Sequence, residues 1–334
     1  MFKFFHPFLK INRREVEFER RGFACSRPEV RQRLEQIGRM FLRGYHGALE
    51  QEDPELLAAD LNQIAAEHRG FAYEGAGMAL TLLDGLSLSK EHRRFLSFVS
   101  GPGKSHIYLV YVGAGWAFAR LPWMRRSIES RIRKLDPIVS SLAIDGYGFH
   151  ENYFHWQSDL QSKILRLSED ARHAFYQGLG RSLWFIQGAD VCAITKSIAA
   201  FPLAFHGDAW SGVGLGCAYA GGNSRAELEE LGDNACQHRA ALAQGVAFAA
   251  KARQLARNPA DHTELACAVL CAMSTEQAAA LCDQTFAQVQ SSTHPSPYQE
   301  WRRLLQQRLT FFSQALLRDR SVDSQPPVTC SKSN

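Results

Sequence analysis

Glycine-bearing apolar segments recur along this chain at a nearly constant spacing. They share a pair of small residues inside a hydrophobic run, as in YEGAGMALTLL, YVGAGWAFARL and YQGLGRSLWFI. The glycines that mark the segments, about 33 residues apart, are Gly44, Gly75, Gly113, Gly146, Gly178, Gly212 and Gly245. A fixed spacing of this length is typical of repeated units built from two helices and a turn. We therefore expect related helices at these places.

The segments between the glycines also predict helices. Candidate N-cap residues, each followed by proline or an acidic first turn, precede three of them at Ser26, Asp53 and Ser224. Alternation of apolar and polar residues is nearly absent, and only residues 106–112 are ambiguous between helix and strand. The fold class that we predict is all-α, more than ~60% helical, with stacked helical hairpins as in an α-solenoid or an α/α bundle.

A single helical repeat domain is expected over residues 28–318, because no Gly/Ser-rich or Pro-rich linker divides it. Residues 1–27 begin with an aromatic and basic stretch that makes a poor signal peptide, and we expect a docking arm there. Residues 319–334 are polar and contain proline, which indicates a disordered tail.

The repeated glycines need a physical reason, since each glycine inside a helix costs about 1 kcal/mol relative to alanine. Close approach of neighbouring helix backbones is one reason. A cavity beside the small residues, in which a flat ligand lies, is another. The two explanations are compatible.

Composition excludes several classes of protein. A net charge of +4, mixed in sign, is too small for a nucleic-acid-binding face. The longest apolar run, residues 107–119, is too short to cross a bilayer, so we expect no membrane insertion. The eight cysteines form no CxxC pair, which fits free thiols in the cytoplasm, with Cys267 and Cys271 as buried small residues. The sequence leaves homo-oligomerisation open.

The segment DGYGFHENYFHW, residues 145–156, is the densest in chemically active side chains. If it is helical, Glu151 and His155 share a face at i, i+4 and could form an oriented acid–base pair. Its candidate catalytic residues are Asp145, His150, Glu151 and His155. The alternative is that its aromatic residues belong to the core and that its polar atoms are satisfied locally.

A second cluster, FHGDAWSG, adds His206 and Asp208 as candidate catalytic residues in an expected loop. His-x-Asp also begins an iron-binding facial triad, but that site needs a β-sandwich, so we expect no metal here. Asp208 as the N-cap of the helix that contains Gly212 is the simpler interpretation.

Charged and aromatic residues inside the apolar segments are candidates for substrate binding. Buried Glu74, Arg120 and Arg181 would need partners, and we expect Arg181 to pair with Glu74, Glu151 or Asp208. The full set of candidate binding residues is Tyr73, Glu74, Trp116, Tyr147, Tyr153, Arg181, Trp184 and Trp210. His106 is expected to be a cap or packing residue. Because stacked repeats place equivalent positions side by side, we expect Asp145, His150, Glu151, His155, Arg181, His206 and Asp208 to line one pocket.

No motif for covalent or cofactor chemistry is present. The glycine pairs do not complete GxGxxG, and the chain lacks GxSxG and HExxH. We therefore expect no cofactor, and either metal-free acid–base chemistry or binding alone.

Six segments together resemble a known family. RRGF (20–23), RGFAYEGAGMALTLLDGL (69–86), VGAGWAFARLP (112–122), IDGYGFHENYF (144–154), GLGRSLWF (178–185) and DAWSGVGLGCAYAGG (208–222) occur in this order. They resemble the domain-of-unknown-function family numbered 1702, over roughly residues 15–285. The resemblance implies a bacterial polyketide cluster, notably of the enediyne type, and carbon–carbon bond formation on the polyketide scaffold. It assigns no catalytic residue.

Two hypotheses about function follow. The first is a cofactor-independent enzyme that forms a carbon–carbon bond or a ring on a polyketide-derived small molecule by acid–base catalysis, for example through epoxide opening. The second is a non-catalytic helical-repeat protein that binds a reactive polyene or enediyne intermediate, or that scaffolds biosynthetic partners. A pocket with converging polar groups favours the first, and an apolar pocket favours the second.

Overall fold

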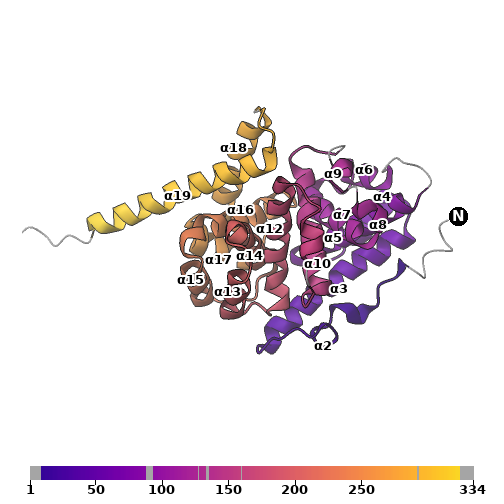
Figure 1. The fold of residues 1–334 in the computed structure, drawn as a ribbon, viewed down its shortest axis with the longest axis horizontal. Helices are drawn as coiled ribbons and strands as arrows, with labels where there is room; N and C mark the ends of the chain where they lie inside the picture. The colour runs from indigo at the N-terminus through magenta and orange to yellow at the C-terminus, as the bar shows by residue number, and fades with distance from the viewer. Residues whose placement is uncertain are drawn as a thin grey trace, which may run out of the picture.

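The middle of the molecule consists of glycine-bearing helices that pack against one another in chain order (Figure 1). The computed structural model describes residues 9–87, 93–126, 128–132, 135–158, 160–291 and 293–323. It is 80% helical, and these residues contain no strand, so the predicted all-α class is confirmed. The central helices are α3 (Pro28–Glu50), α5 (Ala66–Leu86), α7 (Ile107–Arg120), α10 (Leu142–His155), α12 (Glu169–Ile186), α14 (His206–Ala220) and α16 (Arg239–Leu255).

Further helices connect and flank the central ones, so each repeat combines one glycine-bearing central helix with flanking helices. The α-helices among them are α2 (Phe18–Arg21), α4 (Pro54–Asn62), α6 (Arg93–Ser100), α8 (Pro122–Arg125), α9 (Ile128–Ile132), α11 (Gln161–Ile164), α13 (Val191–Ala199), α15 (Arg225–Asn234), α17 (Asp261–Ala266), α18 (Thr275–Gln290) and α19 (Pro297–Asp323). Single turns are η2 (Arg13–Val16), η3 (Lys104–His106), η4 (Val139–Ser141), η5 (Leu203–Phe205), η6 (Cys236–His238) and the π-helical η7 (Cys267–Cys271).

The glycine pairs mark the places where the helix backbones touch. In α7, a Cβ at Gly113 would lie 1.9 Å from the carbonyl oxygen of Glu74 in α5, and a Cβ at Gly115 would lie 2.0 Å from that of Ala143 in α10. The first glycine of each pair thus faces the preceding helix and the second faces the following one. Only glycine allows backbones to approach this closely, so close packing is one reason for the repeated glycines.

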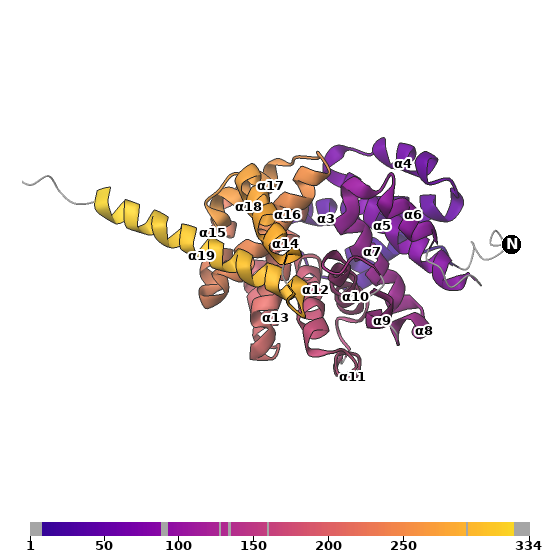
Figure 2. The same cartoon turned by 90° about the horizontal axis from the view of Figure 1, so that it is seen from above.

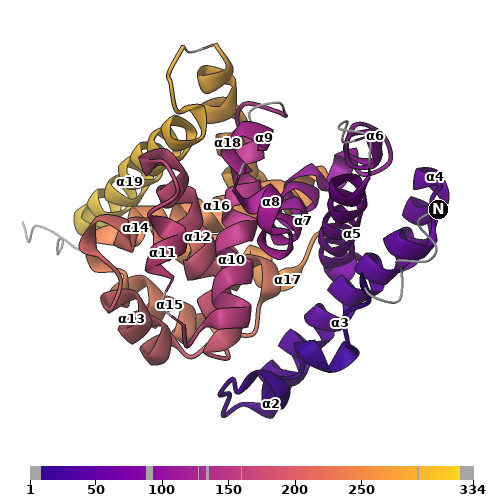
Figure 3. The same ribbon diagram turned by 45° about the vertical axis from the view of Figure 1, so that its right-hand side comes forward.

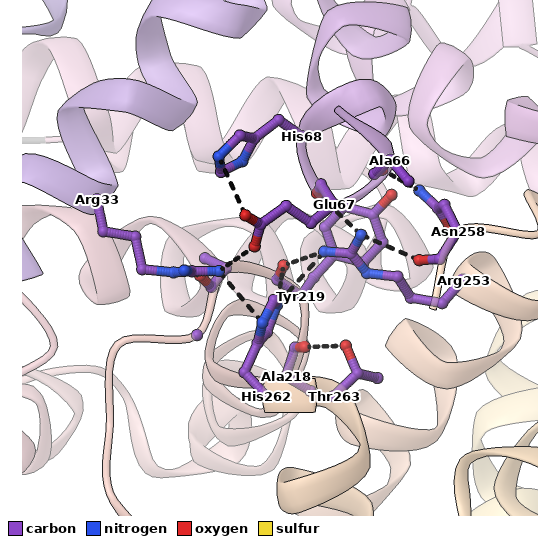
Figure 4. A network of polar contacts seen from close by, with 12 residues as sticks. Arg33, Ala66, Glu67, His68, Ala218, Tyr219, Arg253, Asn258, His262 and Thr263 are labelled. Carbon is purple, nitrogen blue, oxygen red and sulfur yellow. Dashed lines mark hydrogen bonds and ion pairs between the residues drawn. The ribbon is translucent and has the colours of Figure 1, made fainter. Parts of the chain in front are cut away.

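The array of helices closes on itself. The helices at its beginning, α3 and α5, form one side of the molecule, and α14 and α16 form the other (Figures 1 and 2). Arg33 of α3 donates a hydrogen bond of 2.6 Å to the carbonyl oxygen of Ala220, and Arg253 of α16 donates one of 2.9 Å to that of Glu67. Figure 4 shows this cluster, which we call the clasp and define by Arg33, Glu67, Tyr219, Arg253, Asn258 and His262.

Two of the three predicted N-caps are confirmed. Asp53 accepts hydrogen bonds from the backbone at the start of α4, and Ser224 forms a capping box with Glu227 at the start of α15. The third is wrong by one residue, since α3 begins at Pro28 with Arg27 at the N-cap position. The ambiguous stretch that starts at His106 is helical.

The structure describes parts of the expected docking arm and of the expected tail. Within the expected docking arm, residues 9–27 contact the body: Phe18 and Phe23 are buried, and Arg21 donates to the carbonyl oxygen of Tyr153. Residues 1–8 lie outside the described residues. At the other end, α19 continues to Asp323, so residues 319–323 of the expected disordered tail are helical, and residues 324–334 are not described. Figure 3 shows α19 on the side away from α3 and α5.

Among the described residues, no single helix has both the length and the apolar composition of a membrane span. The segments Asp261–Cys271 and Thr275–Gln290 meet these criteria only when taken together, and a bend of 69° separates them.

Candidate functional site

A buried arginine lies at the centre of the closed array. Arg181 of α12 is 5% exposed, and its Nε and Nη2 atoms donate hydrogen bonds of 2.9 and 2.7 Å to one carboxylate oxygen of Asp145 in α10. Its Nη1 atom lies 3.6 Å from the carboxylate of Glu74 in α5. Glycine contacts join α5 to α7, α7 to α10 and α10 to α12, and this close packing brings the three side chains within reach of one another.

Asp145 is held from a second direction as well. Its other carboxylate oxygen accepts a hydrogen bond of 3.0 Å from the amide of Gln177, whose side chain also bonds the Tyr298 hydroxyl. Asp145 is fully buried. A buried ion pair with its remaining lone pairs satisfied in this way is a fixed arrangement, so Asp145 holds Arg181 in place.

Glu74 differs from Asp145 in its distance to Arg181, which is 3.6 Å for Glu74 and 2.7 Å for Asp145. Burial raises the pKa of Glu74 to about 7, although Arg181 opposes the shift, and the nearby charge of Asp145 raises the pKa further. One arginine beside two carboxyl groups explains this result, since a proton on Glu74 leaves a neutral group of three. A carboxyl group of this pKa exists in both protonation states near neutral pH.

Two apolar cavities meet at Arg181. The first cavity, of about 50 Å³, lies between α3, α5, α7, α10 and α12, and Glu74, Trp116, Tyr153 and Arg181 are among the residues that line it. The second, of about 30 Å³, lies between α7, α10, α12, α14, α16 and α19, and Arg181 and Tyr219 are among its lining residues. Each leaves room for only a few water molecules.

Aromatic rings form one wall of the first cavity. Trp116 lies 4.5 Å from Phe41 and 5.0 Å from Phe149, measured between ring centroids. The Trp116 N–H is buried and lies near Glu74, which lowers the pKa of that carboxyl group, but it makes no hydrogen bond of normal geometry within the described residues. A buried donor without a partner at a cavity wall is available to a ligand.

The candidate binding residues thus divide into two groups. Glu74, Trp116, Tyr153 and Arg181 line the first cavity. Neither cavity is lined by Tyr73, Tyr147, Trp184 or Trp210, all of which are buried. Trp184, for example, donates a hydrogen bond of 3.0 Å to the carbonyl oxygen of Gly221. His106 is a packing residue as expected, stacked on the ring of Tyr73 at 4.0 Å.

The expected pair of Glu151 and His155 has a different arrangement. The Glu151 carboxylate is buried and forms an ion pair with Lys163, whereas His155 is exposed. His150 is buried against Phe154, with 4.6 Å between ring centroids. Burial holds the pKa of His150 well below its usual value, with further lowering by Arg120. None of the three lines either cavity.

The interpretation of FHGDAWSG as a loop with Asp208 as N-cap is wrong. The helix α14 begins at His206, and Asp208 lies in its first turn without capping it. Instead, Asp208 accepts a hydrogen bond of 2.6 Å from Arg302 of α19 and lies 2.7 Å from His173. His206 bonds the carbonyl oxygen of Phe201. The described residues contain no group of three or more His, Cys, Asp or Glu that could hold a metal ion.

Three further expectations are decided by these positions. Arg181 pairs with Glu74 as predicted, but its closer partner is Asp145, while Glu151 and Asp208 pair elsewhere. Arg120 is exposed and therefore needs no buried partner. The residues expected to line one pocket do not do so. Of them, only Arg181 lines the two cavities, and only Asp145 pairs with it.

The buried polar residues near Arg181 follow a sequence pattern that the predictions from sequence did not use. The residue immediately before the repeat glycine is buried and polar in five repeats, at Glu74, Asp145, Gln177, Ser211 and Gln244. Successive members bond each other, Asp145 to Gln177 at 3.0 Å and Ser211 to Gln244 at 2.9 Å. This position therefore faces the interior of the array.

Comparison with known proteins agrees with the resemblance in sequence. No curated protein matches the chain significantly. No solved structure does so either. Residues 4–309, most of the chain and all of the central helices, match the family described as "Protein of unknown function (DUF1702)". The chain belongs to this family.

Proposed function

We propose that this protein is a cofactor-independent, cytoplasmic enzyme of polyketide biosynthesis, of the enediyne type, that forms a carbon–carbon bond by acid–base catalysis with Glu74 as the acid. The observation that carries the proposal is a carboxyl group with a pKa of about 7 on the wall of an apolar, aromatic cavity. General acids work best when their pKa is near the working pH. Arg181 and Asp145 keep this group in place.

The proposed step transfers the Glu74 proton to an oxygen leaving group of the substrate, such as an epoxide. The carbon–oxygen bond breaks with its electron pair on oxygen, and the π electrons of a carbon–carbon double bond form the new bond. The resulting carbocation is stabilised by the π electrons of Trp116 and Phe41, which line the first cavity. It then loses a neighbouring proton to the Glu74 carboxylate, which restores the acid, so the reaction is an isomerisation.

The test is deletion of the gene, followed by mass spectrometry of the intermediate that accumulates and by complementation with variants. Glu74→Gln should reduce product formation by about 100-fold or more. The matched control is Glu35→Gln, since Glu35 is a partly buried carboxylate of α3 that pairs with Arg31 and lines neither cavity. In the wild type, the rate should fall as the pH rises through about 7, because the acid form of Glu74 is lost.

Full complementation by Glu74→Gln would refute the proposal. If Glu74→Gln complements and a variant that fills the first cavity does not, the protein is the non-catalytic binder of a reactive intermediate.

A further inference from the structure

The two cavities lie on either side of one charged pair. Arg181 is among the residues that line both of them, and Glu74, its partner at 3.6 Å, lines the first. Away from this pair, both linings are mainly apolar, with leucine, valine and aromatic side chains. The interior of the array thus has two mainly apolar arms that meet at the Glu74–Arg181 pair. The other charged lining residues are paired elsewhere, Glu15 of the first arm with Arg20 and Arg21, and Lys251 of the second arm with Asp283.

From this arrangement we infer that the two cavities are the arms of one binding channel, and that its ligand is a thin, extended, unsaturated hydrocarbon chain that passes Arg181. This inference rests on the proposed function and specifies its substrate class.

The size of the cavities selects the shape of the ligand. With volumes of about 50 and 30 Å³, neither arm holds a fused ring system without large rearrangement of the helices. An unbranched chain has the smallest cross-section of any ligand of comparable length, so it requires the least widening. A compact ligand would fill one arm and leave the other empty.

The polar residues of the channel determine where along the ligand an oxygen atom can lie. Burying an unpaired polar group costs free energy, so an oxygen atom within either apolar arm is disfavoured. At the junction, Glu74, Arg181 and the unpartnered Trp116 N–H offer hydrogen bonds. The reacting oxygen therefore belongs in the interior of the chain rather than at its end, and the new bond forms between inner carbons.

Each arm is lined on one side by residues whose movement would widen it. Ile11 and Val16, from the segment before α3, line the first cavity, and Trp301 of α19 lines the second. These residues belong to the two ends of the chain, which pack on the closed array from outside. Movement there admits a ligand without breaking the glycine contacts between the central helices.

The experiment titrates the full-length protein with 1,6-diphenyl-1,3,5-hexatriene, a neutral rod-shaped polyene that fluoresces in apolar surroundings. The compact neutral dye prodan serves as the comparison. Ile37→Phe fills the first arm, Ala249→Leu fills the second, and Ala199→Phe, at an exposed position of α13, is the control. Circular dichroism establishes that each variant is folded, and Leu34→Phe and Ala252→Leu replace any that is not.

We expect the rod-shaped probe to bind one per chain and to lose at least about tenfold in affinity when either arm is filled, whereas prodan, whose two fused rings exceed the size of either arm, shows no saturable binding to the wild type or to the variants. The control should bind the rod like the wild type. Absence of saturable binding of the rod, or sensitivity to one arm alone, overturns the inference. Binding is measured without turnover, so a failure here is distinct from complementation by Glu74→Gln, which refutes the acid role.

Discussion

Two buried arginines, Arg181 and Arg253, have opposite surroundings. Arg181 faces two carboxyl groups and two cavities, and one of those carboxyl groups has a pKa of about 7. Arg253, only 1% exposed, donates instead to the backbone carbonyl oxygens of Glu67, Tyr219 and Asn258. The first arrangement leaves a protonatable group beside open space, and the second satisfies the ends of helices. Burial of a charged side chain alone therefore does not distinguish a functional residue from a structural one. The hydrogen-bond and ion-pair partners of the side chain do distinguish them.

The largest effect is expected from Arg253→Met, which removes the centre of the clasp. Three carbonyl oxygens lose a charged donor, although that of Tyr219 keeps its contact with His262, and a hydrogen bond to a charged group contributes about 1.5–3 kcal/mol. We expect the free energy of unfolding, measured by urea titration, to fall by about 3 kcal/mol or more. The control Arg239→Met, at a largely exposed ion pair with Asp233, should change it by less than about 0.5 kcal/mol. Equal losses in the two variants would contradict the role of the clasp.

The next effect concerns the glycine contacts that bring the central residues together. Gly113→Ala introduces a Cβ 1.9 Å from the backbone oxygen of Glu74, so α5 and α7 must separate, at a cost of about 2–3 kcal/mol. Gly47→Ala in α3 is the matched control, because its Cβ would meet only Leu57 at 3.6 Å. That variant should gain about 0.4–1 kcal/mol from helix propensity. Thermal unfolding measures the difference in stability between the two variants. If the glycines served only to make the helices flexible, the two variants would not differ.

These glycines also show how much the sequence determines. Their spacing predicted the central helices, and Asp53 and Ser224 predicted helix starts, because both signals act between residues close in the chain. The clasp was not predictable in this way. Glu67 and Arg253 are distant in sequence, and no periodic pattern marks them. Asp208 was misassigned for the same reason, since its partner Arg302 comes from the distant helix α19.

A smaller loss of stability is expected when Glu151 is substituted, and the same substitution distinguishes the role of Glu151 from that of Glu74. Glu151 lies in the segment that is richest in candidate catalytic residues, but it pairs with Lys163 and lines neither cavity. Glu151→Gln weakens a charged hydrogen bond, so it should lower the free energy of unfolding by about 1.5 kcal/mol. In the complementation assay it should make product at close to the wild-type level. A loss of about 100-fold without a change in stability would return the acid role to Glu151.

The smallest effect is the pH dependence of the clasp. Burial lowers the pKa of His262 from 6.5 to about 4, with further lowering by Arg253 and Arg33. A lowered pKa means that the unfolded chain binds the proton more readily, so the contribution of neutral His262 is present above pH 6.5 and is lost as the pH falls towards 4. We expect a loss of about 1 kcal/mol between about pH 7 and pH 5.5 in urea titrations. His262→Asn should reduce this slope, and an unchanged slope would show that His262 is not responsible.

The contrast between the two arginines depends most on the protonation state of Glu74. Infrared difference spectroscopy between wild type and Glu74→Gln, recorded as a function of pH, detects a buried carboxylic acid without any substrate. We expect an acid carbonyl band at neutral pH that disappears as the pH rises through about 7 and that is missing from the variant. A spectrum in which Glu74 is fully ionised down to about pH 5, close to the ordinary range of a glutamate, would show that Glu74 is not the proposed acid.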